Sequence, residues 1–193
     1  MTRDCSRIFY LMGASGSGKD SLLRECREQL GAADRCFVAH RYITRAPELA
    51  GENHIWLTET EFSQREACGA FAMHWQANGL RYGIGCEVDL WLEQGNSVLV
   101  NGSRSFLPLA QMQYADRLVP LMVRVDTDLL LQRLRSRGRE SEPQILARVE
   151  RARQFQEGMS DGVAVIDNNG SLAEGVGQLL KVLRSFNGVA EGR

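Results

Sequence analysis

The segment from Gly13 to Lys19 is the first in the chain whose residue types and spacing point to a defined chemistry. It follows the pattern G-x-x-x-x-G-K and stands between an apolar segment and one with a helical spacing of leucines. Glycines let successive backbone N–H groups face an anion, the start of a helix adds positive potential, and the lysine ammonium reaches a phosphate chain. The pattern predicts a nucleotide-phosphate loop made of Gly13, Ala14, Ser15, Gly16, Ser17, Gly18 and Lys19.

The lysine of this loop is one of two lysines among 23 basic residues, the other being Lys181, which favours a specific role for Lys19. The next residue in such a loop is usually a Ser or Thr that ligates magnesium, but here it is Asp20. Two interpretations stay open. The Asp20 carboxylate faces the metal, directly or through water, with Ser21 taking part of the role, or Asp20 is a first-turn acid that the helix dipole stabilises.

Arginines gather between residues 133 and 153. A charge run can be a solvated helix face without function, or a lid whose guanidinium groups close over a moving phosphoryl group. The phosphate loop in the same chain favours the lid, and Ser141, Pro143 and Gln144 predict the start of a helix inside it. The arginines of this cluster are Arg133, Arg135, Arg137, Arg139, Arg148 and Arg151.

A second polar group lies in residues 41–82, a segment of short alternating pieces around one predicted helix. Arg41, Thr44, Arg45 and Tyr82 would form a second phosphate pocket if the fold brought them together. Taken singly, Tyr82 is equally consistent with a packed loop aromatic. The three histidines have no metal-ligand spacing, so we expect no zinc site.

The elements that would position these residues alternate along the chain. Helical patterns separate five apolar segments typical of strands, which are residues 7–12, 36–39, 97–101, 118–125 and 163–167. This alternation predicts an α/β fold with a parallel five-stranded sheet flanked by helices. We expect a single domain over residues 1–193, with a core of residues 7–40 and 83–186, a substrate-binding insert at about 41–82 and a lid at about 133–153.

Composition narrows the class of protein further. The chain has 193 residues, 44% of them hydrophobic, and a net charge of −1, which gives no basis for a nucleic-acid binder driven by phosphate attraction. No apolar run approaches the roughly 18 residues of a membrane span, and the first residues do not resemble a secretory signal. Five scattered cysteines without a C-x-x-C pair favour reduced thiols. We expect a cytoplasmic monomer or homodimer.

The order of these motifs resembles the guanylate kinase family over roughly residues 7–186. Residues 43–45 stand where that family carries T-T-R, residues 82–83 match its G-x-x-Y-G element, and residues 133–138 followed by Arg148 match its lid. The resemblance implies a P-loop kinase that uses ATP and Mg²⁺. It also implies a loop after the last strand in which Asn168 contacts the adenine. It assigns catalysis to Lys19, Arg133, Arg137 and Arg148.

The departures from the family carry information about the acceptor. Glu48 replaces a second arginine, His54 replaces a tyrosine, and Met73 and Ile84 stand at the positions that read the guanine base. A pocket without donors and acceptors rejects guanine because the polar edges of the base stay unpaired. We therefore do not expect GMP to be the acceptor.

A branch of the family shares G-K-D-S at residues 18–21 and V-N-G-S-R at residues 100–104. This branch phosphorylates ribose 1,5-bisphosphate in bacterial phosphonate breakdown. The resemblance implies transfer from ATP to the 1-phosphate, giving 5-phosphoribosyl 1-diphosphate (PRPP) and ADP, with Asn101 and Arg104 near the sugar. The alternatives are a nucleoside monophosphate kinase with altered base choice, a catalytically inactive binding module and a regulatory nucleotide switch. The intact loop and lid disfavour the module.

Overall fold

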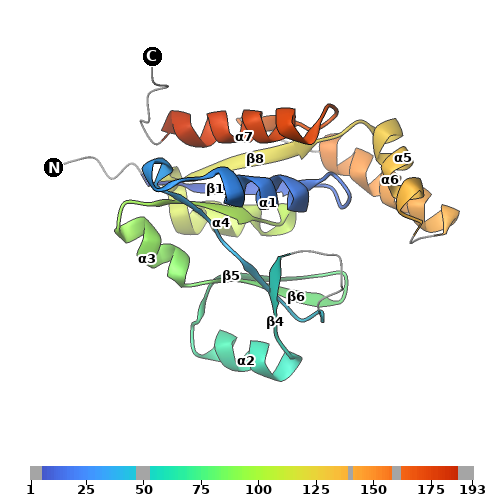
Figure 1. Ribbon diagram of the computed structural model, residues 1–193. Coiled ribbons are helices and arrows are strands. Elements are labelled where there is room, and N and C mark those ends of the chain that lie inside the picture. Colours follow the sequence, from blue (N-terminus) through green and yellow to red (C-terminus); the bar gives the residue numbers. More distant parts are fainter. Residues whose placement is uncertain (1–5, 47–52, 139–140, 158–161, 187–193) are drawn as a thin grey trace, which may run out of the picture.

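The structure is a computed structural model of the chain, and it describes residues 6–46, 53–138, 141–157 and 162–186. Figure 1 labels the elements in chain order. The strands are β1 (Ile8–Gly13), β2 (Cys36–Val38), β3 (Arg41–Ile43), β4 (His54–Trp56), β5 (Phe71–Ala77), β6 (Leu80–Gly85), β7 (Ser97–Asn101), β8 (Leu118–Arg124) and β9 (Ala164–Asp167). The α-helices are α1 (Lys19–Gln29), α2 (Glu59–Ala67), α3 (Glu87–Glu93), α4 (Leu107–Tyr114), α5 (Thr127–Arg137), α6 (Glu142–Glu157) and α7 (Leu172–Phe186).

The main sheet has five parallel strands in the order β2-β7-β1-β8-β9. The predicted parallel five-stranded sheet is therefore confirmed, and each apolar segment forms a strand within two residues of its expected bounds. β1 lies at the centre, so its carboxyl end delivers the phosphate loop between the ends of β7 and β8. Polar side chains that follow several strands can meet at this edge.

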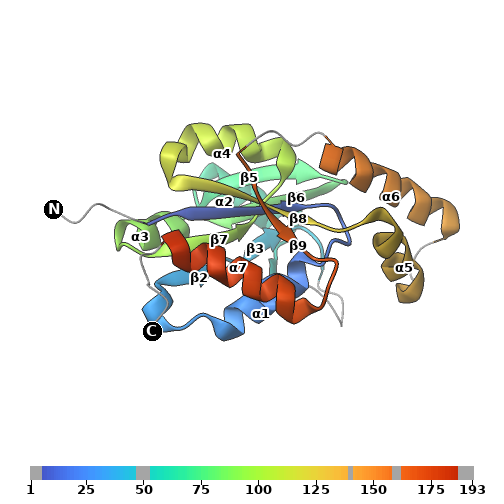
Figure 2. The ribbon, with the colours of Figure 1, turned by 90° about the horizontal axis from the view of Figure 1, so that it is seen from above.

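Helices cover both faces of the main sheet, as Figures 1 and 2 show. Successive side chains of a strand point to opposite faces, and in β1 Phe9 and Leu11 pack with α1 and α7, whereas Tyr10 and Met12 pack with α3 and α4. All four side chains are fully buried. A strand buried on both faces needs the continuous apolar sequence that β1 carries.

A second sheet, in the order β4-β3-β6-β5, is built from residues 41–85 and lies with α2 below the main sheet in Figure 1. Met73 of β5 and Ile84 of β6 are buried in the apolar cluster that also contains Tyr10 of β1. The polar insert is thus attached to the core by two apolar side chains. A smaller cluster of Leu57, Phe62 and Phe71 holds α2 against the second sheet.

Helices α5 and α6 lie beyond the carboxyl end of β1 (Figure 1). Leu130, Leu134 and Ile145 are buried together with Ala14 of the phosphate loop, so the helix pair packs directly on the loop. The predicted start of α6 holds in part, because the Ser141 amide donates to Gln144 Oε1 at 2.9 Å. The Ser141 hydroxyl also donates to that oxygen instead of capping the helix amide.

Two further findings concern the described part of the chain. None of its helices has the length and apolar character that a membrane crossing requires. Its four cysteines, Cys26, Cys36, Cys68 and Cys86, are free thiols.

Candidate active site

The backbone of the phosphate loop depends on two glycines. Gly16 and Gly18 both have φ of 91°, a left-handed conformation that costs a side-chain-bearing residue about 1–2 kcal/mol. Space is also restricted there, because a Cβ on Gly16 would lie 2.9 Å from Leu130 Cδ1 and one on Gly18 would lie 2.4 Å from Asn168 Nδ2. The loop therefore needs glycine at both positions to keep its backbone open toward an anion.

Lys19 is the first residue of α1, and its side chain returns over the loop. Its Nζ donates to Gly13 O at 2.6 Å and to Ala14 O at 3.0 Å. The ammonium group is thereby placed above the concave backbone and at the positive end of the helix, where phosphate oxygens are favoured.

The loop is supported from behind by Ser17 and Asn168. The Ser17 amide donates to Ala14 O at 3.1 Å, so this N–H is used inside the loop. The side-chain amide of Asn168 donates from Nδ2 to Ser17 O at 2.7 Å, and the residue is 4% exposed. The buried side chain therefore faces the loop, and the expected contact of Asn168 with adenine stays a prediction.

Asp20 joins the phosphate loop to two other elements. Asn101 at the end of β7 donates from Nδ2 to Asp20 Oδ1 at 2.9 Å, and Arg41 of β3 lies 3.3 Å from the same oxygen. This ion pair and hydrogen bond bring three predicted site residues together from positions 20, 41 and 101. The second carboxylate oxygen of Asp20 is left for another group.

These residues border a hollow beside the start of α1, which we call the acceptor hollow. Asn101 is 3% exposed, and its Oδ1 has no hydrogen-bond partner in the structure. A buried carbonyl oxygen without a donor is costly, so Asn101 is suited to accept from a ligand hydroxyl. The described residues that line the hollow are Asp20, Leu23, Arg27, Ala39, Arg41, Asn53 and Asn101.

The turn after β7 is fixed by a tyrosine from the neighbouring strand. The Tyr10 hydroxyl donates to Ser103 O and accepts from the Ser103 amide, both at 2.9 Å. A Cβ on Gly102 would lie 2.2 Å from the Tyr10 ring, which explains the glycine between Asn101 and Ser103. Burial raises the pKa of Tyr10, so its hydroxyl stays protonated as the donor. Asn101 is thereby held at the mouth of the acceptor hollow.

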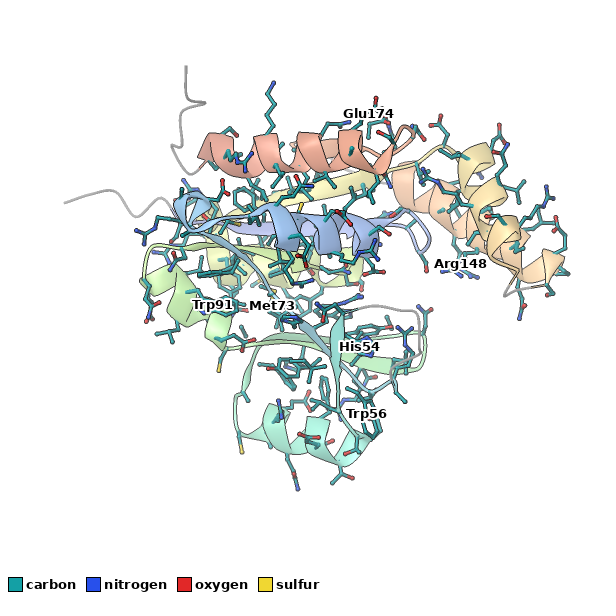
Figure 3. All side chains as sticks on the ribbon, viewed as in Figure 1. His54, Trp56, Met73, Trp91, Arg148 and Glu174 are labelled. Carbon is teal, nitrogen blue, oxygen red and sulfur yellow. The ribbon has the colours of Figure 1, made fainter. Side chains whose placement is uncertain are left out.

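Arg148 of the helix pair reaches the loop, and Figure 3 labels this residue near α5 and α6. Arg148 Nη2 donates to the Ser15 hydroxyl, and Arg133 Nη2 donates to Asn168 O at 3.0 Å. Arg104 Nη1 makes a long contact of 3.4 Å to Gln154 O of α6. Arg137 lies at the end of α5, and its side chain is outside the described part of the structure. Arg148 thus reaches the loop itself, and Arg133 reaches the backbone of Asn168, whose side chain supports the loop.

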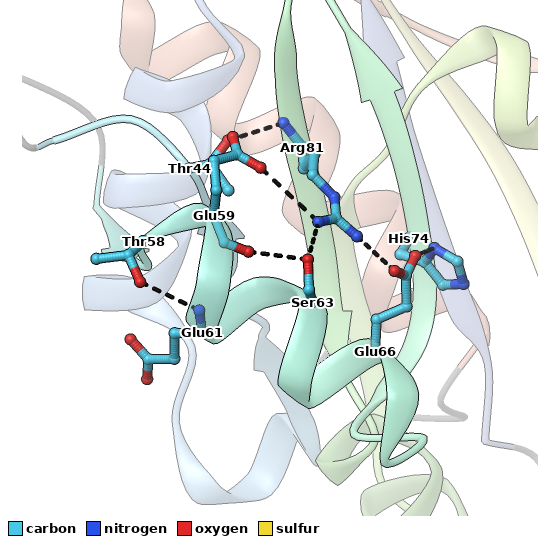
Figure 4. A network of polar contacts seen from close by, with 8 residues as sticks. All are labelled: Thr44, Thr58, Glu59, Glu61, Ser63, Glu66, His74 and Arg81. Carbon is cyan, nitrogen blue, oxygen red and sulfur yellow. Dashed lines mark hydrogen bonds and ion pairs between the residues drawn. The ribbon is translucent and has the colours of Figure 1, made fainter.

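The residues predicted in the insert divide into two groups. Tyr82 stacks on Trp75, with ring centroids 5.6 Å apart, and the Arg41 guanidinium lies 5.7 Å from the Tyr82 ring centroid. Thr44 instead receives the Arg81 amide on its hydroxyl at 3.0 Å, a contact drawn in Figure 4. Tyr82 therefore adjoins the acceptor hollow through Arg41. Thr44 and Arg45 are not among its lining residues.

The positions expected to read a base are apolar and closed. Met73 and Ile84 face each other across β5 and β6 and are 1% and 0% exposed. Figure 3 shows Met73 between the second sheet and the main sheet. These side chains fill the space between the sheets and offer no donor or acceptor to a purine.

Arg27 is a lining residue of the acceptor hollow that the motifs did not indicate. Asp20, Leu23 and Arg27 follow the spacing i, i+3, i+7 on α1, which places them on one helix face. The sequence signal that could have indicated Arg27 was this helical spacing, counted from the residue after the loop lysine.

Fold and site together define a P-loop kinase of the guanylate kinase type. The solved guanylate kinase of Anaplasma phagocytophilum superimposes with a TM-score of 0.68 at 17% identity, covering 93% of this chain and 86% of that one. At this identity the likeness concerns the fold.

Sequence comparison places the chain more narrowly. It is 49% identical over 178 residues to the ribose 1,5-bisphosphate phosphokinase PhnN of Pantoea vagans, covering 92% of this chain and 97% of that protein. The PhnN of Thiobacillus denitrificans is 54% identical over 149 residues, 77% of this chain and 78% of its own length. No protein-family model matches the chain. The chain belongs to the ribose 1,5-bisphosphate phosphokinase (PhnN) family.

Proposed function

We propose that this chain transfers the γ-phosphoryl group of ATP to the 1-phosphate of ribose 1,5-bisphosphate, giving PRPP and ADP. The observation that supports this proposal is the acceptor hollow beside the phosphate loop, where Asp20, Arg41 and Asn101 meet. It offers a guanidinium group and an amide, while the base-reading positions are occupied by apolar side chains. This chemistry suits a sugar phosphate better than a nucleotide.

The phosphate loop fits the triphosphate of ATP. Its two left-handed glycines keep side chains out of the concave backbone, and Lys19 is held over it. Gly13, Ala14, Ser15, Gly16, Gly18 and Lys19 would hold the β- and γ-phosphates, with Ser17 and Asn168 supporting the loop from behind.

A magnesium ion fits beside the same loop. Asp20 uses one carboxylate oxygen for Asn101 and Arg41, which leaves Oδ2 for a metal or a metal-bound water. Ser21 follows it in the first turn of α1. Hard oxygen ligands of this type are those Mg²⁺ takes alongside phosphates. The ion would neutralise charge on the β- and γ-phosphates.

The remaining residues bind the acceptor and neutralise the moving group. Arg41 and Tyr82 would hold the reacting 1-phosphate, and Asn101 would accept from a ribose hydroxyl. Thr44, Arg45 and Arg104 stay candidates for binding the acceptor, although the Thr44 hydroxyl accepts from the Arg81 amide and Arg104 makes a long contact with Gln154 O. Arg133, Arg148 and, by sequence, Arg137 would close on the transferring phosphoryl group.

The reaction is an in-line displacement. An oxygen of the 1-phosphate forms a bond to the γ-phosphorus while the bond to the β-phosphate oxygen breaks and ADP leaves. The acceptor oxygen is already ionised at neutral pH, so no general base is needed. Rate enhancement then comes from positioning and from positive charge around the equatorial oxygens.

The test is ADP release by the full chain with ATP and magnesium, comparing ribose 1,5-bisphosphate with GMP at matched concentration. Phosphorus NMR identifies the product, and a diphosphate on C1 of the sugar is expected. Turnover of GMP without turnover of the sugar bisphosphate would overturn the proposed acceptor and leave the phosphate-loop chemistry intact. The cytoplasmic location and the monomeric or dimeric state remain predictions from the sequence.

A further inference from the structure

Arg27 is the second cation of the acceptor hollow and lies two helical turns after Asp20. It is half-buried on α1, and its Nε is buried without a hydrogen-bond partner. Its Nη2 makes a long contact of 3.4 Å with Val38 O. The Nε donor of this guanidinium group is therefore buried without an acceptor among the described residues.

Among the described residues, the Glu28 carboxylate acts on the charge of Arg27 without forming an ion pair with it. Arg41, the other cation of the hollow, pairs with Asp20 at 3.3 Å, whereas no described carboxylate forms an ion pair with Arg27. Burial lowers the pKa of Arg27, which reflects the cost of a charge removed from water. Burial and the charge of Arg27 also lower the pKa of nearby His40, which favours its neutral form, so it adds no second positive charge. An anion in the hollow would relieve this cost.

We propose that Arg27 binds the non-reacting 5-phosphate of the acceptor and thereby selects for a sugar that carries two phosphates. This inference rests on the proposed function and adds to it the residue that recognises the far end of the substrate. The geometry is a buried donor edge facing the same hollow as Asp20 and Asn101.

Arg41 is held by Asp20 at the start of α1, and Arg27 lies about two helical turns further along this helix. Asp20 and Arg27 are seven residues apart, which is about 10 Å along a helix. The end near Asp20 and Arg41 adjoins the phosphate loop and takes the reacting phosphate. Asn101 lies at that end with its free carbonyl oxygen, and Asn53 borders the hollow with a second amide. A sugar ring between two phosphates would meet amide groups and would carry one phosphate to each arginine.

The experiment pairs a change in the protein with a change in the ligand. Arg27→Met keeps the aliphatic bulk and removes the charge, and Arg24→Met on the exposed side of the same helix is the matched control. Steady-state kinetics measure KM for ribose 1,5-bisphosphate. Ribose 5-phosphate and ribose 1-phosphate serve as competitive inhibitors that carry one phosphate each.

Loss of a charge-assisted phosphate contact should raise KM about 10- to 100-fold in Arg27→Met. The inhibition constant of ribose 5-phosphate should rise by a similar factor, while that of ribose 1-phosphate should not change. Arg24→Met should behave as the unsubstituted chain. Equal weakening of both inhibitors would overturn the assignment, because a general distortion of the hollow does not distinguish the two ends.

The two proposals fail differently. If the unsubstituted chain does not turn over ribose 1,5-bisphosphate, the proposed function fails, and calorimetric binding of ribose 5-phosphate then decides the role of Arg27. Binding that is lost in Arg27→Met supports the assignment, and binding that is absent or unchanged overturns it. If turnover is normal and KM is the same in both chains, the 5-phosphate assignment alone is wrong.

Discussion

At the scale of a single residue, Lys19 is the positive charge that is held over the phosphate loop. Its ammonium group donates to two loop carbonyl oxygens, which places it over the backbone that receives phosphate. The other lysine, Lys181, is exposed on α7. Lys181 can therefore serve as an exposed control residue for Lys19.

We expect Lys19→Ala to lower kcat by about 10²-fold or more, because the variant loses positive charge that stabilises the transferring phosphoryl group. Lys181→Ala should leave kcat unchanged. Steady-state ADP release measures both, and circular dichroism checks that each variant is folded. Near-normal turnover by Lys19→Ala would contradict the assignment of the phosphate loop.

At the scale of elements, Arg81 joins α2 to the hairpin of β5 and β6 (Figure 4). Its guanidinium donates to the Ser63 hydroxyl at 2.7 Å and to the Glu66 carboxylate. It also lies 4.4 Å from the Phe62 ring centroid. The backbone N–H of Arg81 also donates a hydrogen bond to the hydroxyl of Thr44, in the segment after β3. The Thr44 hydroxyl therefore serves this junction in the described structure.

Arg81→Met should lower the free energy of unfolding by about 1–3 kcal/mol, because two charge-assisted contacts are lost while the packing on Phe62 is largely kept. Amide hydrogen exchange in α2 should become faster. Arg24→Met, at an exposed site, should change stability by no more than about 0.5 kcal/mol. Urea unfolding followed by fluorescence measures the difference, and equal stability of the two variants would show that α2 is held by its apolar cluster alone.

At the scale of the whole molecule, the helix pair of α5 and α6 is brought onto a loop more than a hundred residues earlier in the chain. Arg148 reaches Ser15, and Ile145 on the same helix is buried with Ala14. Arg151 is exposed on that helix. The helix therefore presents one arginine to the loop and another to solvent.

Arg148→Ala should lower kcat by about 10²-fold if the guanidinium stabilises charge on the transferring group. Arg151→Ala should retain nearly full activity, because its side chain points to solvent. Rapid-quench measurement of phosphoryl transfer distinguishes loss of chemistry from slower product release. Equal losses in the two variants would mean that α6 acts through its packing and not through Arg148.

An ion pair joins α7 to the 3-10 turn of Ala32–Asp34 that follows α1. Arg184 of α7 lies with its Nε 2.7 Å from Asp34 Oδ1, and Asp34 also accepts from the Gly31 amide at 2.9 Å. The hydrogen bond from Arg184 lowers the pKa of Asp34 below its ordinary value. A lowered pKa stabilises the folded state above the unfolded pKa of about 4, and this contribution is lost as pH falls through the folded value.

Asp34→Asn should therefore lower the free energy of unfolding at pH 7 by about 1–3 kcal/mol. The difference from the unsubstituted chain should shrink as pH falls from about 4 through the lowered pKa of the folded state, below which the carboxyl is protonated in both states. Urea unfolding at pH 7, 5 and 3 checks the direction. A difference that is independent of pH would indicate lost hydrogen bonding without a charge contribution.

The sequence by itself determined the phosphate-loop motif, the five parallel strands and the start of α6. These features depend on local properties: glycine conformations, apolar runs of strand length and helical periodicity. Gly16 and Gly18 adopt left-handed conformations because of their position in one motif. The apolar identity of Met73 and Ile84 was likewise visible in the sequence and indicated that a base-reading pocket was missing.

Tertiary structure alone decided which polar groups meet. Asp20 is bonded to Asn101, 81 residues away, because the ends of β1 and β7 are adjacent in the main sheet. The Asn168 side chain supports the loop, because it is buried against the Ser17 carbonyl oxygen. Arg27 became a site residue because the fold places one face of α1 along the acceptor hollow. Hydrogen bonds and ion pairs act over a few ångströms, so their partners follow from strand order and packing, which no local pattern contains.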